Sequence, residues 1–231
     1  MSSLKSKSVL TGILLLSGIV AGILSSVPAL ERPDYIAALA EISGQVYMAA
    51  VFQGIFACVY TGLACVLYSV LKDYEPGIAL LYFSFRIVGA AALFLAIVPL
   101  LLLLMLSKQY LEVGNDHGES LIVIAELVRL TRDGINHMAM ILPWSIGGMF
   151  LHIGAINSRL LPGWISWWGL LGSFLTFMAT GLLIVEVIQI ASPIYFILNT
   201  PTALVEIVLA IYLLWKGFRP PADGHGQPGA P

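Results

Sequence analysis

The sequence predicts an all-α fold, a polytopic membrane bundle of six transmembrane helices. Of its 231 residues, 59% are hydrophobic and only 10% are charged, whereas a soluble domain carries about 25% charged residues. The mean hydropathy is +0.94. The apolar residues also gather into six stretches, each close to the roughly 20 residues that a helix needs to cross a bilayer. The solvent of most of the chain is therefore expected to be lipid.

Loops that contain charges, proline or glycine separate these stretches. In order, the stretches cover residues 9–30, 46–71, 77–106, 138–156, 163–187 and 202–215. The first has a basic start and a cleavage-like site at residues 27–29, as a signal peptide would. Its length and its Gly18-x-x-x-Gly22 spacing favour a retained helix instead. The last stretch is short, and Pro193 and Pro201 interrupt the apolar segment before it, so a re-entrant or interfacial turn is an alternative there.

Small residues and cysteines inside the stretches are expected to serve packing. Glycines thin the fourth and fifth helices so that neighbours can approach closely; they are Gly147, Gly148, Gly154, Gly169 and Gly172. Cys58 and Cys65 lie seven residues apart in one helix, too far to form a disulfide. We expect both to be buried thiols.

The distribution of basic residues predicts the orientation. With the N-terminus inside, the cytoplasmic ends carry Lys5, Lys7, Lys72, Arg159, Lys216 and Arg219. The other side carries Arg32, Lys108, Arg129 and Arg132. By the positive-inside rule, both termini are expected to be cytoplasmic in a cell (plasma or inner) membrane. The predicted organisation is a cytoplasmic N-terminus (residues 1–8), a transmembrane domain (9–219) and a disordered cytoplasmic tail (220–231) rich in Pro and Gly.

Residues 119–133 have an amphipathic rather than a spanning pattern. Apolar residues recur on one helical face and charged residues on the other. Spacings of three and four residues predict the ion pairs Glu126–Arg129 and Arg129–Asp133. This helix is expected either to continue into the fourth stretch or to lie on the membrane surface.

Two opposite charges are predicted to lie at one depth in the membrane. Arg86 is about 13 Å along the third stretch from its cytoplasmic end, and Glu206 is about 15 Å along the sixth from the same side. An unpaired charge there costs at least about 2.5–3.5 kcal/mol. We therefore expect an Arg86–Glu206 ion pair, either as a structural link or as a binding site for a substrate, ion or proton.

Polar residues near the outer ends of the fourth and fifth stretches are a second candidate constellation. They are Asp133, Asn136, His137, Glu186 and Gln189. They could line one outer polar cavity or be an ordinary polar helix boundary, and a His among carboxylates can bind metal or relay protons. His152, nearer the cytoplasmic end, is expected to be hydrogen-bonded packing rather than a ligand-binding residue.

The sequence contains no phosphate-cradling Gly loop, no Gly-x-Ser-x-Gly elbow, no Cys-x-x-Cys and no twin-His metal motif. No catalytic residue, metal or cofactor is therefore assigned, and an enzyme is less expected than a non-enzyme. The net charge of −2 gives no reason to expect nucleic acid as a partner.

Three segments together resemble a known family. The third stretch contains Phe85-Arg86 followed by two apolar residues and, after Gly89, Ala90. The fourth-to-fifth connection has a short basic loop, then Leu-Pro-Gly at 161–163 and Gly169; the last stretch has an acidic residue, Glu206, and a closing Lys-Gly at 216–217. Over roughly residues 8–218 the chain is similar to the bacterial domain-of-unknown-function 4386 family of multi-pass membrane proteins. Val205 stands where a Gly is expected. The resemblance implies a six-helix membrane protein and no particular activity.

These observations lead to three functional hypotheses. The first is a carrier or binding protein for a small molecule or ion at the Arg86–Glu206 layer. The alternative is a non-catalytic membrane partner or sensor subunit that docks through residues 119–133. The third is a membrane enzyme with Asp133, His137 and Glu186 as acid–base or metal groups. Expected partners are the lipid bilayer, a small ligand or ion, and another membrane protein.

Overall fold

The chain folds into helices throughout the part that the structure describes. The computed structural model describes residues 2–113, 118–190 and 192–219, and within these residues it contains no β-strand. Six helices of this described part are long and apolar enough to cross a membrane, which suggests a multi-pass membrane protein. The predicted fold class is thus confirmed. The predicted disordered tail, residues 220–231, lies outside the described residues.

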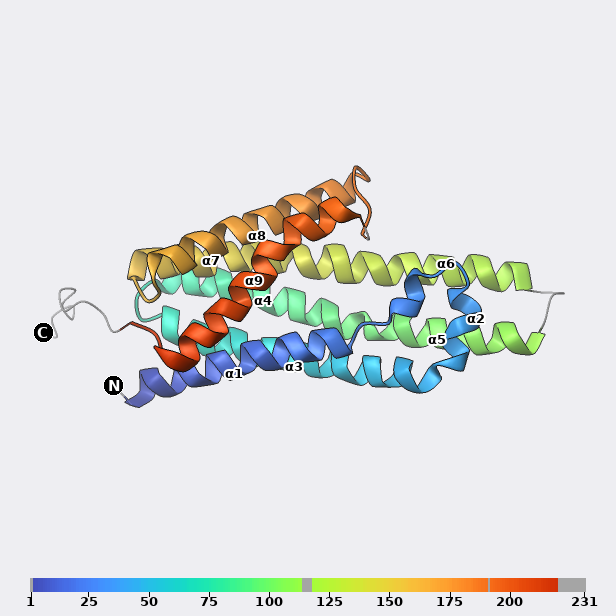
Figure 1. Cartoon of the computed structure of the whole chain (residues 1–231), viewed down its shortest axis with the longest axis horizontal. Helices are drawn as coiled ribbons and strands as arrows, with labels where there is room; N and C mark the ends of the chain where they lie inside the picture. The colour runs from blue at the N-terminus through green and yellow to red at the C-terminus, as the bar shows by residue number, and fades with distance from the viewer. Residues whose placement is uncertain (1, 114–117, 191, 220–231) are drawn as a thin grey trace, which may run out of the picture.

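By their mutual contacts, the spanning helices form a closed ring. In ring order they are α1 (Ser2–Leu24), α3 (Ser43–Leu71), α4 (Pro76–Leu95), α7 (Ile141–Ser158), α8 (Gly163–Ile184) and α9 (Pro193–Trp215). Each contacts the next, and α9 contacts α1 again. The start of α1 and the end of α9 lie at one end of the ring, which we call the terminal end (Figure 1). The α3–α4 and α7–α8 turns lie there too.

Glycines on α1 allow the ring to close. A β-carbon on Gly12 would lie 2.7 Å from Leu214 Cγ of α9, and one on Gly18 would run into the Tyr60 ring of α3. A β-carbon on Gly22 would touch the Phe56 ring at 3.4 Å. Gly18 and Gly22 therefore serve helix packing, as their spacing predicts. Retained as a helix, α1 fills the gap between the second and the last spanning helices.

A helical hairpin extends the ring at the opposite end, which we call the hairpin end (Figure 1). It consists of α5 (Ile97–Val113), which continues α4, and α6 (Gly118–Gly134), which leads through a π-helical turn (Ile135–Met140) into α7. The stretch Gly118–Ser158 has 41 residues, or about 61 Å at 1.5 Å per residue. A hydrocarbon core is only about 30 Å thick, so this stretch is longer than one straight crossing needs. Of the two predicted alternatives, the amphipathic segment continues into the next helix.

Two prolines explain where the regular α-helical pattern of these long helices is interrupted. Pro99 has no N–H to give to the carbonyl of Leu95, and α4 ends at that residue. Pro143 likewise leaves the carbonyl of Ala139 without its usual donor, and the π-helical turn ends at Met140. These interruptions therefore follow from the sequence.

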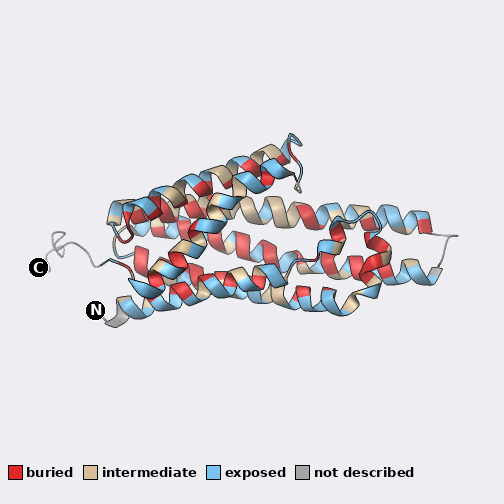
Figure 2. Ribbon diagram, in the orientation of Figure 1, coloured by how far each residue is buried: buried red, intermediate tan, exposed pale blue. Residues whose placement is uncertain are grey.

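Two short helices, η1 (Pro28–Glu31) and α2 (Tyr35–Glu41), pack beside the hairpin and form a second hydrophobic core with it (Figure 2). Tyr35 Oη donates a hydrogen bond to Glu126 of α6 at 3.1 Å. Burial and the neighbouring Glu126 carboxylate raise the pKa of Tyr35 to about 12, so the phenol remains a donor at neutral pH. The α2 segment is thereby attached to α6.

The charged side of α6 faces inward. The predicted pairs are confirmed, with Arg129–Glu126 at 2.7 Å and Arg129–Asp133 at 3.0 Å. Arg132 and Asp133 are buried. Aliphatic residues of the same helix are exposed instead, namely Ile122, Val123, Ile124, Leu127 and Leu130. The reason is that α5 packs along α6 and that Tyr35 of α2 contacts Glu126 and Arg129.

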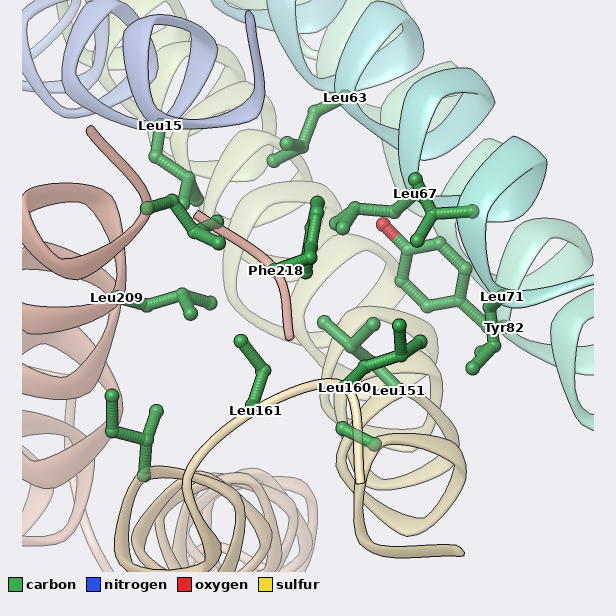
Figure 3. Close-up of a cluster of buried hydrophobic side chains, with 14 of the residues drawn as sticks. Leu15, Leu63, Leu67, Leu71, Tyr82, Leu151, Leu160, Leu161, Leu209 and Phe218 are labelled. Atoms are coloured by element: carbon green, nitrogen blue, oxygen red, sulfur yellow. The ribbon is translucent and has the colours of Figure 1, made fainter. Parts of the chain in front are cut away.

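An apolar plug closes the terminal end of the ring. Phe218, which follows α9, lies at the centre of the cluster, with Leu209 on one side and Leu67 on the other (Figure 3). Leu160 and Leu161 of the α7–α8 loop complete it. The cavity that these side chains line holds only about 10 Å³, room for one water molecule at most. No water path crosses the terminal end through this cluster.

Two expectations about single helices are wrong. The last helix begins at Pro193 and is continuous through Pro201, so there is no re-entrant turn. Ser192 is its N-cap and accepts a hydrogen bond from the Tyr195 N–H, with Pro193 at the first helical position, where proline fits. Cys58 and Cys65 are exposed rather than buried, because their face of α3 points out of the ring.

Candidate functional site

Polar and aromatic side chains meet inside the ring between the plug and the hairpin end. Their members come from four spanning helices and are called the polar layer. They are Tyr60 of α3, Tyr82 and Arg86 of α4, Trp144 and His152 of α7, and Glu206 of α9. Aromatic, cation–π and hydroxyl contacts connect five of them, and His152 lies beside Gly169 of α8.

Arg86 is a buried cation between aromatic rings. Only 9% of the residue is exposed. Its Cζ lies 5.2 Å from the centre of the Trp144 ring and 5.7 Å from that of Tyr82, and such cation–π contacts offset part of the lost hydration. Among the described residues, however, its buried Nε and Nη1 have no hydrogen-bond partner. A buried polar group without a partner costs free energy.

Glu206 belongs to the same layer but does not form the predicted ion pair. Within the described part of the chain, no salt bridge of 4.0 Å or less joins it to Arg86. Instead, Tyr60 Oη donates to Glu206 Oε2 at 2.8 Å. The Tyr60 ring in turn contacts the Trp144 ring, with centroids 4.2 Å apart. Trp144 and Tyr60 therefore lie between the opposite charges of Arg86 and Glu206. The predicted direct ion pair is wrong, and the two residues are connected through these aromatic side chains instead.

The α7–α8 interface brings small residues against the layer. A β-carbon on Gly148 would lie 2.5 Å from Ser173 Oγ and 3.6 Å from Arg86 Nη2. One turn along, a β-carbon on Gly169 would overlap the His152 imidazole. Gly148 and Gly169 thus give the close helix packing that the sequence predicts. They also leave the guanidinium next to a serine hydroxyl rather than a bulky side chain.

His152 and Tyr82 add two more buried polar atoms. In the described residues, His152 Nδ1 and Tyr82 Oη have no hydrogen-bond partner. Tyr82 is fully buried and His152 is 5% exposed. His152 was expected to be a packing residue with its ring nitrogens hydrogen-bonded, and for Nδ1 this expectation is wrong. Buried polar atoms without partners are rare in folded proteins, and a bound molecule is one physical reason for them.

The outer polar residues have separate partners. Asp133 is bonded to Arg129 and Arg132. Asn136 Oδ1 accepts from Gln53 Nε2 at 3.3 Å, and His137 Nδ1 is 2.8 Å from Tyr195 Oη.

Glu186 and Gln189 follow α8 and are exposed. Where the structure describes the chain, no hydrogen bond or salt bridge connects them to Asp133, Asn136 or His137. Nor do the described residues contain a group of three His, Cys, Asp or Glu that could hold a metal ion. The expected shared outer cavity is thus not assembled from these side chains.

Sequence reasoning missed the aromatic members of the layer. Tyr60, Tyr82 and Trp144 lie in apolar helices, where an aromatic residue is usually interpreted as a packing residue. A usable signal was nevertheless present, because a buried tyrosine hydroxyl needs a partner. Gln53, which donates to the carbonyl of Leu93 as well as to Asn136, was missed in the same way.

Comparison with known proteins gives one match. The model of a family described as Domain of unknown function (DUF4386) matches residues 10–217. No curated protein and no solved structure matches the chain.

Proposed function

The chain belongs to the DUF4386 family, a family of unknown function, and from its polar layer we propose that it is a membrane-embedded binding protein and carrier for a small anion. The supporting observation is the set of donors around Arg86. Its Nε and Nη1 are buried and have no partner in the described residues, and neither has Tyr82 Oη. Hydrogen bonds from a guanidinium to an anion are short and strong. An anion at Arg86 would therefore accept hydrogen bonds from its Nε and Nη1 donors.

Two closures on either side of the layer support the carrier part of the proposal. At the terminal end, Phe218 and the Leu160–Leu161 pair form the apolar plug. At the hairpin end, Gln53–Asn136 and His137–Tyr195 join helices across the ring by hydrogen bonds. A carrier must open its site to one side at a time, and each closure depends on few contacts.

The proposed orientation has both termini in the cytoplasm of a cell membrane. The terminal end carries six Lys or Arg side chains, among them Lys72 of the α3–α4 turn and Arg159 of the α7–α8 loop. Basic residues in short loops favour the cytoplasmic side. Exposed Trp164, Trp167 and Trp215 at the same end form an aromatic belt typical of a membrane–water interface.

Thermal unfolding of the detergent-purified protein tests anion binding. Sodium chloride, nitrate and acetate should each be compared with sodium gluconate, whose anion is much larger. A bound anion at 100 times its Kd stabilises the fold by about 2.7 kcal/mol, equivalent to a shift of about 5–10 °C for a chain of this size. Arg86→Gln should abolish the shift.

The matched control is Arg159→Gln, which removes an exposed charge at the terminal end and should keep the full shift. Arg86→Lys keeps the charge and should keep part of it, which guards against loss of fold in the glutamine variant. An unshifted wild-type protein with all three anions, or an unchanged shift in Arg86→Gln, would show that the proposal is wrong.

A further inference from the structure

We infer that an anion enters the polar layer together with one proton, and that Glu206 takes up this proton. The inference rests on the proposed anion binding at Arg86 and adds its charge balance.

The ionisable groups around Glu206 can be named helix by helix. From α3, Tyr60 donates to its carboxylate; from α4 come Arg86 and Tyr82, and from α7 comes His152. The flanking helix α8 has no ionisable side chain between Gly163 and Ile184. The other flanking helix, α1, has only Lys5, which is exposed, and Lys7, whose Nζ donates to the carbonyl of Ser69. Before an anion binds, the layer therefore contains one basic side chain, Arg86, and one acidic side chain, Glu206, and its net charge is zero when Glu206 is ionised.

An added anion would leave one net negative charge in this layer. Burying an uncompensated charge in a low-dielectric interior is strongly unfavourable. Uptake of one proton from water restores the balance: the proton forms an O–H bond on the Glu206 carboxylate, and the anion stays with Arg86. The layer then holds Arg86, the anion and a neutral Glu206, so its total charge is again zero.

Tyr60 fits both states of Glu206. With Glu206 ionised, the Tyr60 hydroxyl donates to Oε2, as in the structure. With Glu206 protonated, the carboxyl O–H can donate to the same hydroxyl oxygen, because a phenol is both donor and acceptor. His152 is the less suitable acceptor, because a proton on it would place a second positive charge close to Arg86. The geometry therefore points to Glu206.

The test measures proton uptake during anion binding. Nitrate and chloride do not titrate between about pH 5.5 and 7.5, so any proton taken up must go to the chain. Isothermal titration of the full-length protein in buffers of different ionisation heat gives the number of protons bound per nitrate. We expect about one for the wild type, with a Kd that weakens about tenfold for each unit of rising pH. Glu206→Gln should bind nitrate with no proton uptake and a Kd independent of pH.

Two further variants locate the proton. Glu112→Gln removes an exposed carboxylate of the hairpin and should keep the uptake of one proton. His152→Gln should keep it as well, and loss of uptake in that variant would move the proton to His152 and overturn the inference. Wild-type binding of nitrate without proton uptake would overturn the inference while the proposed function stands. If nitrate, chloride and acetate all fail to bind at any pH, the proposed function fails, and the inference fails with it.

Discussion

The double variant Arg86→Met/Glu206→Gln is expected to unfold at about the same temperature as the wild type, although each single change is strongly destabilising. Each single variant leaves one buried charge without its counter-charge, which costs about 2.5–3.5 kcal/mol and lowers the unfolding temperature by about 5–14 °C. The double variant holds no buried charge in the layer. Replacing both charges of a buried pair by neutral groups is often neutral or stabilising.

A thermal double-mutant cycle in gluconate buffer measures this coupling. The matched control is the cycle Arg159→Met/Glu112→Gln, whose exposed residues lie at opposite ends of the molecule and should be additive. If the losses of the two single changes at Arg86 and Glu206 simply add in the double variant, the charges do not compensate each other across Trp144 and Tyr60. The double variant should also have lost its response to nitrate, because Arg86 is gone.

Gly169→Ala is expected to cost about 3 kcal/mol, at the upper end of the range for overpacking a well-packed interior. The new methyl group would overlap the His152 imidazole, well inside any real non-bonded contact. His152 cannot move away easily, because it is buried on α7 directly opposite this position. The expected result is a loss of about 6–12 °C in unfolding temperature.

Rescue by a second change identifies the cause. His152→Ala removes the ring, so Gly169→Ala/His152→Ala should recover most of the loss. Gly181→Ala, in the same helix, is the control: nothing lies within 4 Å of the added β-carbon, so it should be neutral or stabilise by up to about 1 kcal/mol through helix propensity. An equal loss in Gly181→Ala would mean that glycines in α8 matter for backbone freedom rather than for space.

The spanning helices and the depth of the polar layer could be predicted because both depend on position along a helix. Apolar length identifies each helix, and a rise of 1.5 Å per residue sets Arg86 and Glu206 at similar depth. Depth does not determine which residue stands between two helices. Trp144 and Tyr60 lie between the charges, and only the packing of α3, α4, α7 and α9 around one ring reveals that.

Other differences between the predicted and the observed structure depend on neighbouring residues, which a local sequence pattern does not specify. The amphipathic pattern of α6 predicts one charged and one apolar face but not which of them packs, and in the structure Arg132 and Asp133 are buried while Val123 and Leu127 are exposed. Pro193 follows Ser192 and occupies the first helical position, where its missing N–H has no cost, so the last helix is not interrupted there. The atoms of Arg86 and His152 that have no partner in the described residues could not be predicted at all, since they depend on three-dimensional packing.

The closure of the ring also constrains the order in which the molecule can be made. The Phe218 N–H donates to Ser8 Oγ at 2.9 Å across a separation of 210 residues, and α1 packs against α9 as well as α3. During synthesis α1 enters the membrane before α9, which is one of its two neighbours in the ring. Until α9 is made, the Gly12 face of α1 has no helix to pack against. Because such long-range contacts form late, a chain interrupted before α9 keeps this face of α1 exposed.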